Sequence, residues 1–209
     1  MNWKQNCLTL IDYFKIMKKD VIDKLDIYKI KTSEELLKYY RNWTDKNKYN
    51  KDMVEWQYTA PQETVSVLKK YAFKKNCKIL DAGCGTGLVG IELKKNGYSN
   101  IEGVDFSQNM LGLVPQGIYK KIGKVDLNKP LKFKANMYDV IMCVGTFTYG
   151  HVKPKALDEL IRITKNRGLI CFTINEGIYE EYGFDNKIKE LSNNKLWNVK
   201  EFFKSDYIV

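Results

Sequence analysis

The chain has 209 residues, of which 44% are hydrophobic, and a formal net charge of +10. This length and apolar content suit one α/β domain with a substantial core. No stretch reaches the roughly 18 uninterrupted apolar residues of a membrane-spanning helix. Asn, Asp or Lys interrupts every apolar run near the start of the chain, which argues against a secretory leader. We expect a soluble, cytoplasmic protein that does not bind membranes.

Cysteine and histidine are too sparse for a conventional metal site. The chain has five cysteines, none in a C-x-x-C pair, and one histidine. An odd number of unpaired cysteines is typical of thiols in a reducing compartment. Structural zinc needs several Cys or His ligands at close spacing. We therefore expect neither a disulfide bond nor a metal.

The positive charge raises the question of nucleic acid, because a basic face binds phosphate backbones. The lysines, however, are spread through the whole chain among Asn, Tyr and Ile, and acidic residues interrupt them. A compositional preference explains this distribution equally well. Because the lysines are dispersed, the positive charge gives only weak support for a nucleic-acid partner, which it does not exclude.

Residues 1–58 are expected to form an N-terminal helical extension or lid. Apolar residues recur at three- and four-residue intervals in 9–25 and in 33–43, as on one face of a helix. A further helix is expected near Pro61, because the first turn of a helix tolerates proline. We assign 59–209 to the main domain and expect one compact unit overall.

From Lys78 onward, short apolar runs alternate with helical patterns. This order predicts an α/β fold, with a Rossmann-like, doubly wound, mostly parallel sheet and helices on both faces. Ligands in such sheets bind at the carboxyl ends of the strands. The expected strands are 78–80, 101–105, 117–127, 138–145, 168–174 and 199–209, and the expected helices are 88–97, 107–114, 154–165 and 179–194.

A glycine-rich loop follows the first of these strands, in the stretch KILDAGCGTGLVG. Gly83, Gly85 and Gly87 alternate behind Asp81, as expected where a backbone lies close to a ligand. A phosphate-binding P-loop is excluded, because no Gly-Lys-Ser/Thr follows the glycines. A nicotinamide or flavin dinucleotide remains a competitor, since Gly90 completes a G-x-G-x-x-G pattern.

The two aspartates decide between these ligands. Asp105 ends the second strand, about where a ribose-binding acid is expected in either case. Asp81 would repel an anionic pyrophosphate but would attract a cationic amine. S-adenosylmethionine has an adenosine for Asp105 and an ammonium for Asp81, and the helix N-terminus after the loop suits its carboxylate. The loop therefore favours this methyl donor.

The chain resembles the class I S-adenosylmethionine-dependent methyltransferases, and most closely the methyltransferase-like family named after the Williams–Beuren syndrome region. The resemblance covers roughly 39–209. It is carried by LDAGCGTG, GVDFSQNML, VDL, YDVIMCVGTF and LIRITKNRGLICFTI, together with VEWQYTAP and FTINEGIYEEYGF. It implies a transferase that converts S-adenosyl-L-methionine to S-adenosyl-L-homocysteine.

The resemblance also implies cofactor-binding roles. These are Asp81, Gly83, Gly85 and Gly87 for the methionine end, Asp105 for the ribose hydroxyls, Phe106 and Met110 near the adenine, Asp126 and Leu127 for the adenine amino group and its packing, Cys143 and Val144 beside the sulfonium, and Tyr58 in a segment folded over the cofactor.

The methyl acceptor is less well defined. His151 follows the fourth strand, where a general base could lie, although it could equally anchor its loop. Tyr149 and Glu176 are expected at the same rim as further acceptor-binding candidates. The Asn/Asp-Pro-Pro-Tyr/Phe motif of enzymes that methylate base amines is replaced by Cys143–Phe147. We expect a small-molecule acceptor, methylated on N, O or S.

The carboxyl-terminal part departs from the family pattern. Residues 199–209 are interpreted as the sixth strand, and none remain for the final antiparallel strand that the resemblance implies. The sheet then has an exposed gap, or a homodimer partner or another chain completes it, or the sequence is truncated. The alternatives to a small-molecule methyltransferase are a cofactor-binding pseudo-methyltransferase or regulatory partner, and an RNA methyltransferase.

Overall fold

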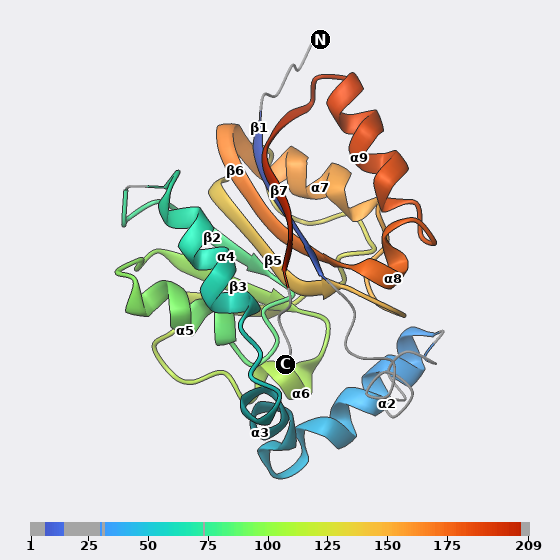
Figure 1. Cartoon of the computed structure of the whole chain (residues 1–209). Helices are drawn as coiled ribbons and strands as arrows, with labels where there is room; N and C mark the ends of the chain where they lie inside the picture. Colours follow the sequence, from blue (N-terminus) through green and yellow to red (C-terminus); the bar gives the residue numbers. More distant parts are fainter. Residues whose placement is uncertain (1–6, 15–29, 31, 73, 206–209) are drawn as a thin grey trace.

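The computed structural model describes residues 7–14, 30, 32–72 and 74–205 (Figure 1). Strands and helices alternate over most of this range. In chain order the elements are β1 (Cys7–Phe14), α2 (Ser33–Thr44), η2 (Asp45–Asn47), α3 (Lys48–Glu55), α4 (Ala60–Lys69), β2 (Ile79–Ala82), α5 (Leu88–Lys95), β3 (Ile101–Asp105), α6 (Gln108–Leu111), β4 (Lys121–Lys124), β5 (Tyr138–Phe147), α7 (Ala156–Ile163), β6 (Thr164–Asn175), α8 (Glu176–Tyr179), α9 (Phe184–Asn193) and β7 (Trp197–Ser205).

The seven strands form one sheet in the order β4-β3-β2-β5-β6-β1-β7. Every neighbouring pair is parallel. The predicted Rossmann-like sheet is therefore confirmed, as is the lack of a final antiparallel strand within the described residues. The first strand after the N-terminal helices, β2, lies near the middle, so the strand order reverses beside it. That switch is where α/β sheets bind ligands.

Two apolar clusters cover the two faces of the sheet, as predicted. Adjacent residues of β2 point to opposite faces, so Leu80 joins one cluster and Ile79 the other. The first cluster packs α7 and α9 against the sheet, and the second packs α4 and α5 (Figure 1). Among the described residues, no helix is long and apolar enough to cross a membrane.

The helix expected over 9–25 is wrong in its first part. Cys7–Phe14 forms β1, which lies between β6 and β7 and pairs with both; 15–29 lie outside the described residues. Leu10 is opposite Cys171 on one side and Glu201 on the other. Two strand neighbours provide ladder hydrogen bonds on both sides, which outweigh a weak local helical pattern. The expected gap beside the sixth strand is thus filled from the same chain.

The predicted helix over 33–43 is confirmed as α2. Thr32 caps its start: the Thr32 hydroxyl accepts from the Glu35 amide at 3.2 Å, and the Glu35 carboxylate accepts from the Thr32 amide at 3.1 Å. The chain then turns through Lys46 and Asn47, both with positive φ, into α3. The helix expected near Pro61 is α4, with proline in its first turn.

Aromatic side chains hold α2 and α3 together. Trp43 lies within 4.8 Å of Tyr49 and 5.8 Å of Trp56 between ring centroids, and its indole N–H donates to the Asp52 carboxylate at 2.6 Å. In Figure 1 both helices lie beneath the sheet, beside α6. We call α2, η2 and α3 the lid segment.

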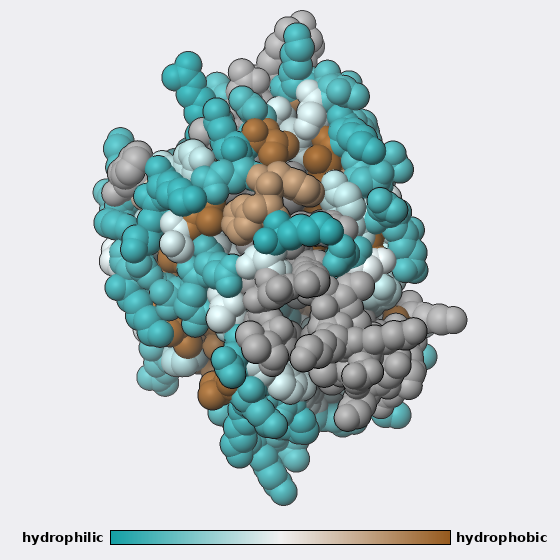
Figure 2. Space-filling view, viewed as in Figure 1, coloured by the Kyte–Doolittle hydropathy of each residue, from teal (hydrophilic) through white to brown (hydrophobic). Residues whose placement is uncertain are grey.

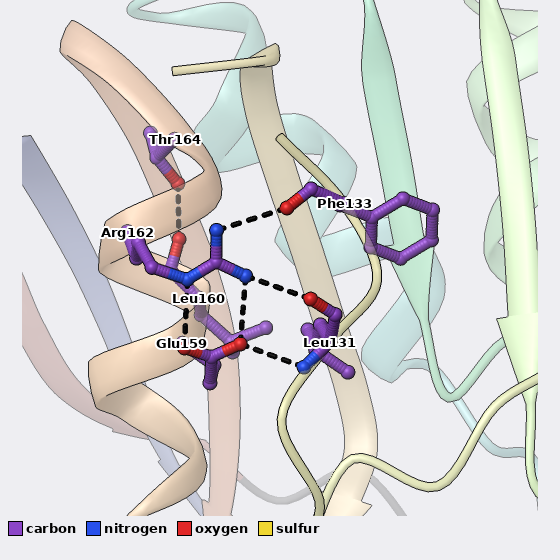
Figure 3. A network of polar contacts seen from close by, with 6 residues as sticks. All are labelled: Leu131, Phe133, Glu159, Leu160, Arg162 and Thr164. Atoms are coloured by element: carbon purple, nitrogen blue, oxygen red, sulfur yellow. Dashed lines mark hydrogen bonds and ion pairs between the residues drawn. The ribbon is translucent and has the colours of Figure 1, made fainter. Parts of the chain in front are cut away.

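An ion-pair network holds the loop between β4 and β5 (Figure 3). The Arg162 guanidinium on α7 donates to the carbonyls of Leu131 and Phe133, both at 2.9 Å. Glu159 pairs with the same guanidinium and accepts from the Leu131 amide at 2.7 Å. These charge-assisted bonds fix a loop that has no regular structure of its own.

The coloured part of the face seen in Figure 2 is mostly hydrophilic, with apolar atoms gathered above its middle, over the region of β7 in Figure 1. β7 is an edge strand, and its Phe202 is 48% exposed. Lysines at 200 and 204 flank Phe202 on this strand and are exposed, a common protection of edge strands against pairing.

Candidate functional site

A pocket lies where the carboxyl ends of β2, β3 and β5 meet the lid segment. It encloses about 930 Å³, counting the part that opens to solvent. Its lining residues are Leu36, Tyr40, Tyr49, Tyr58, Pro61, Gly83, Cys84, Gly85, Thr86, Leu88, Val89, Asp105, Phe106, Ser107, Met110, Val125, Asp126, Leu127, Asn128, Val144, Gly145, Thr146, Gly150, His151 and Val152. The lining therefore draws on both the ends of the strands and the lid segment.

The glycine loop forms the floor of this pocket. Gly83 has φ +83°, and a Cβ there would lie 2.2 Å from the Thr146 hydroxyl oxygen, so the loop packs directly on the end of β5. A Cβ on Gly85 would meet nothing within 4 Å. The loop thus has one side closed by the protein and one side open to a ligand, and Gly85 lies on the open side.

Asp105 lines the pocket at the end of β3. Its carboxylate accepts from the amides of Gly85 and Ser107, each at 2.8 Å. Burial raises the pKa of Asp105, while these amide bonds oppose the rise. A carboxylate oxygen has two lone pairs, so both oxygens can still accept from a ligand hydroxyl. This arrangement suits the predicted ribose contact.

Asp81 lies behind the loop and does not line the pocket. Its side chain is fully buried, and one oxygen accepts from the Tyr119 hydroxyl at 2.6 Å. The other oxygen, Oδ1, has no hydrogen-bond partner among the described residues. Burial raises the pKa of Asp81 to about 7, although the Tyr119 bond lowers it. A buried carboxylate with a free oxygen is a site that a cationic group can stabilise.

Glycines make room for the Tyr119 ring. A Cβ on Gly90 would lie 2.4 Å from the ring, and one on Gly103 would lie 3.1 Å from it. The third glycine of the predicted motif, Gly87, has φ +92° and its Cβ would lie 3.5 Å from the same ring. The glycine pattern therefore serves two purposes, which are the approach of a ligand and the fit of Tyr119.

The remaining cofactor candidates divide into two groups. Six residues with predicted contacts line the pocket besides Gly83, Gly85 and Asp105: Tyr58, Phe106, Met110, Asp126, Leu127 and Val144. Gly87 and Cys143 do not line it. Cys143 is fully buried in the first apolar cluster, the one that includes Leu80.

The three acceptor candidates are separated in the same way. His151 lines the pocket. The Tyr149 ring turns away and packs on the start of α8, where a Cβ on Gly177 would lie 2.0 Å from its hydroxyl. Glu176 pairs with Lys204 of β7 at 2.8 Å. His151 is the one candidate of the three at the pocket wall.

His151 is held at both ring nitrogens. Nδ1 lies 2.5 Å from the Tyr149 carbonyl oxygen, and Nε2 lies 2.5 Å from the Tyr40 hydroxyl oxygen. Burial lowers the pKa of His151 to about 4, so the ring is neutral at neutral pH. The neighbouring loop is fixed as well, because Asn128 donates to the His151 carbonyl at 3.1 Å and accepts from the Lys153 amide at 2.8 Å.

Most of the lid residues that line the pocket were not predicted from the sequence. Leu36, Tyr40 and Tyr49 line the pocket from α2 and α3. Burial and the charge of Asp105 raise the pKa of Tyr49. The density of aromatic residues in 39–58 was a usable signal, since such clusters usually cover apolar surface. Which ring meets the pocket depends on tertiary docking.

The pocket differs in charge from the whole chain. Its described lining residues contain two acidic side chains, Asp105 and Asp126, and no lysine or arginine, although the chain has a net charge of +10. No group of three His, Cys, Asp or Glu side chains suited to a metal ion occurs among the described residues. The pocket therefore favours neutral or cationic ligands over phosphates.

Both the sequence and the fold of this chain are similar to those of known methyltransferases. A family model described as a methyltransferase domain matches residues 80–172. Human methyltransferase-like protein 27 is 33% identical over 141 residues, or 66% of this chain and 56% of the relative. A ribosomal protein L11 methyltransferase from Thermotoga neapolitana is 28% identical over 140 residues, or 67% of this chain and 50% of the relative.

A solved structure supports the fold. A Methanococcus maripaludis protein assigned to the S-adenosyl-L-methionine-dependent methyltransferases has a TM-score of 0.52 at 19% identity, covering 70% of this chain and 69% of that one. The chain spans about half the length of the curated relatives that it matches.

Proposed function

We infer from the matching family model and relative that the chain contains a class I S-adenosylmethionine-dependent methyltransferase domain, and we propose that it transfers a methyl group from S-adenosyl-L-methionine to N, O or S of a small molecule. The observation that carries the proposal is the pocket. It combines an open glycine loop, a ribose-type carboxylate and an aromatic lid, and its lining has no lysine or arginine among the described residues.

The residues at the pocket fit the cofactor. Asp105 would accept from the ribose hydroxyls. The unpaired oxygen of Asp81, which is buried behind the loop, would attract the ammonium group of a cofactor in the pocket. Phe106 and Met110 offer apolar surface to the adenine, and Asp126 offers an acceptor for its amino group. When bound, the cofactor supplies an electrophilic methyl group on a sulfonium.

The protein's own tasks are to orient the acceptor and to exclude water. Leu36, Tyr40 and Tyr49 of the lid segment cover the pocket with apolar surface and two hydroxyl groups. His151 adds a neutral ring to the same wall. We assign the lid role to α2, η2 and α3 on this basis.

Charge and enclosure favour a small acceptor over RNA. An RNA substrate would need basic side chains beside the methyl site, because phosphate contacts supply much of its affinity. The described pocket lining has none. A protein acceptor, as named for the ribosomal protein L11 methyltransferase, would have to enter past the lid segment.

Calorimetry with S-adenosylmethionine and with S-adenosylhomocysteine tests the cofactor. We expect binding of both, and Asp105→Ala should remove it, whereas Asp139→Ala at the opposite end of the sheet should not. Asp139 is a suitable control because its carboxylate bonds the Lys78 amide and Lys165, away from the pocket. Absence of binding to the wild type would refute the proposal.

Transfer with methyl-labelled cofactor then tests the acceptor class. We expect label in the small-molecule fraction of a cell extract and not in the RNA or protein fractions. Label in RNA would support the RNA methyltransferase alternative. Binding of cofactor without transfer to any fraction would support a pseudo-methyltransferase, an alternative motivated by the missing antiparallel strand.

A further inference from the structure

We propose that Tyr40 selects the methyl acceptor, and that His151 fixes the Tyr40 hydroxyl so that its oxygen can only accept a hydrogen bond; the acceptor is then an amine with at least one N–H. This inference rests on the proposed methyl transfer and names its substrate class. Both side chains line the pocket, and their contact joins the lid segment to the loop after β5.

The hydrogen positions follow from the contacts of the ring. The Tyr149 carbonyl oxygen can only accept, so Nδ1 of His151, at 2.5 Å, must carry a hydrogen. The ring is neutral, because burial lowers the pKa of His151 to about 4. A neutral imidazole carries one N–H, so Nε2 has a lone pair and must receive the hydrogen of Tyr40.

The Tyr40 hydroxyl therefore donates its one hydrogen to His151, and its oxygen can only accept a hydrogen bond from a ligand. Burial also raises the pKa of Tyr40 well above its usual value, so the hydroxyl keeps its proton. A ligand group that meets this oxygen must donate a hydrogen. Groups that can only accept, such as a carboxylate or a phosphate, would be repelled by its lone pairs.

An amine fits these constraints better than an alcohol or a thiol. A hydroxyl or thiol acceptor must lose a proton to become a good nucleophile, and the imidazole and carboxylates of the described lining are already hydrogen-bonded. His151 is a weak base with Nε2 already bonded. Asp105 and Asp126 both accept backbone amides. A neutral amine needs no base.

The transfer balances without a protein base. The nitrogen lone pair forms the new N–C bond, the methyl–sulfur bond breaks with its electron pair on sulfur, and the product is an N-methylammonium ion that keeps its N–H. That N–H remains bonded to the Tyr40 oxygen. The nearby acidic residues Asp105 and Asp126 favour the positive charge that forms on nitrogen. The proton leaves to water after release.

Nuclear magnetic resonance tests the Tyr40–His151 arrangement without any acceptor. The chain has one histidine, so ¹⁵N-histidine labelling gives a single imidazole. We expect the Nδ1–H tautomer, no protonation between pH 8 and 5, and a changed Nε2 resonance in Tyr40→Phe. The Nε2–H tautomer, or ordinary titration near pH 6.5, would overturn the inference.

A modified extract tests the acceptor class. Half of a metabolite extract is treated with formaldehyde and cyanoborohydride, which turns primary and secondary amines into tertiary amines without N–H. We expect label transfer to the untreated half and at least tenfold less to the treated half. Undiminished transfer to the treated half would overturn the inference while leaving methyl transfer itself intact.

Two tyrosine variants separate selection from folding. Tyr40→Phe should lower kcat/KM for the labelled amine about tenfold, the size of one lost hydrogen bond, with cofactor affinity unchanged. Tyr39→Phe removes a hydroxyl from the same helix at a residue that does not line the pocket, and should change kcat/KM less than twofold. Equal effects of the two variants would contradict a specific role of Tyr40. Absence of cofactor binding in the wild type would instead refute the proposed function.

Discussion

The two walls of the pocket are built differently. The sheet wall consists of loops after β2, β3 and β5, in which backbone amides, the buried Asp81 and the partly buried Asp105 make the main hydrogen bonds. The lid wall consists of aromatic side chains on α2 and α3, joined to the sheet wall by a few side-chain bonds. We expect changes in the sheet wall to affect folding and cofactor affinity, and changes in the lid wall to affect the acceptor and the rate at which ligands leave.

Asp81→Asn should have the largest effect on the sheet wall, and the effect depends on pH. The folded-state pKa of Asp81 is about 7, raised by burial from 3.8. Its contribution to stability is therefore present below about pH 4 and is lost as the pH rises through 7. One pKa unit corresponds to about 1.4 kcal/mol, so the loss totals about 4 kcal/mol.

The asparagine variant removes this titration. Relative to the wild type, its free energy of unfolding should fall less between pH 4 and 8, as measured by urea denaturation without cofactor. Its cofactor affinity at pH 8 should decrease, because the ammonium loses a negative partner. Parallel stability curves for the two proteins would show that Asp81 titrates normally.

Gly83→Ala should destabilise the sheet wall by about 2–3 kcal/mol. The added Cβ would lie 2.2 Å from the Thr146 hydroxyl, in a backbone conformation with φ +83°. Gly123→Ala is the matched control, since a Cβ there meets nothing within 4 Å. Thermal unfolding compares them, and a similar Tm for both variants would contradict the close packing of the loop on β5.

Arg162→Met should cost about 1 kcal/mol, because the network of Figure 3 is partly exposed and solvent screens it. The loop that carries Asp126 would lose two carbonyl contacts. We therefore expect weaker cofactor binding as well, by a few-fold in Kd. Arg41→Met, at an exposed position of α2, should leave Kd unchanged. An unchanged Kd in Arg162→Met would show that this network does not affect cofactor binding.

Asn50→Ala should have the smallest effect, below about 1 kcal/mol in stability. It removes the bond that the Thr86 hydroxyl donates to Asn50 at 2.6 Å, which links the lid to the glycine loop. Faster cofactor dissociation, by about two- to fivefold, should appear in stopped-flow measurements. Thr86→Val removes the same bond from the other wall, and the double variant should add nothing further; additive effects would mean that the two residues act separately.

The sheet wall could be predicted from the sequence because its determinants are local. Alternating glycines behind Asp81, and Asp105 at the end of the next strand, occur in short motifs whose backbone geometry depends on a few adjacent residues. The right-handed crossovers of α/β units limit the strand orders that can surround them. The partner of Asp81 was not predictable in this way, because Tyr119 reaches it from another loop.

The lid wall and β1 depend on contacts between distant segments. Tyr40 bonds His151, which is 111 positions further along the chain, so no local pattern identifies the pair. The period of 9–25 favoured a helix, whereas pairing with β6 and β7 makes Cys7–Phe14 a strand. Three-dimensional pairing outweighed helix propensity in that segment.

The position of β1 sets the order in which the sheet can be completed. During synthesis Cys7–Phe14 is made before the other described strands, but its partner β6 follows about 160 residues later, and until then the segment lacks that partner. β7 in turn has β1 as its strand neighbour within the described residues. β1, which lies early in the chain, must therefore be in the sheet before β7 can pair with it. Contacts between such distant segments slow folding. A change that delayed the pairing of β1 would leave β7 unpaired for longer and would expose a newly made chain to aggregation.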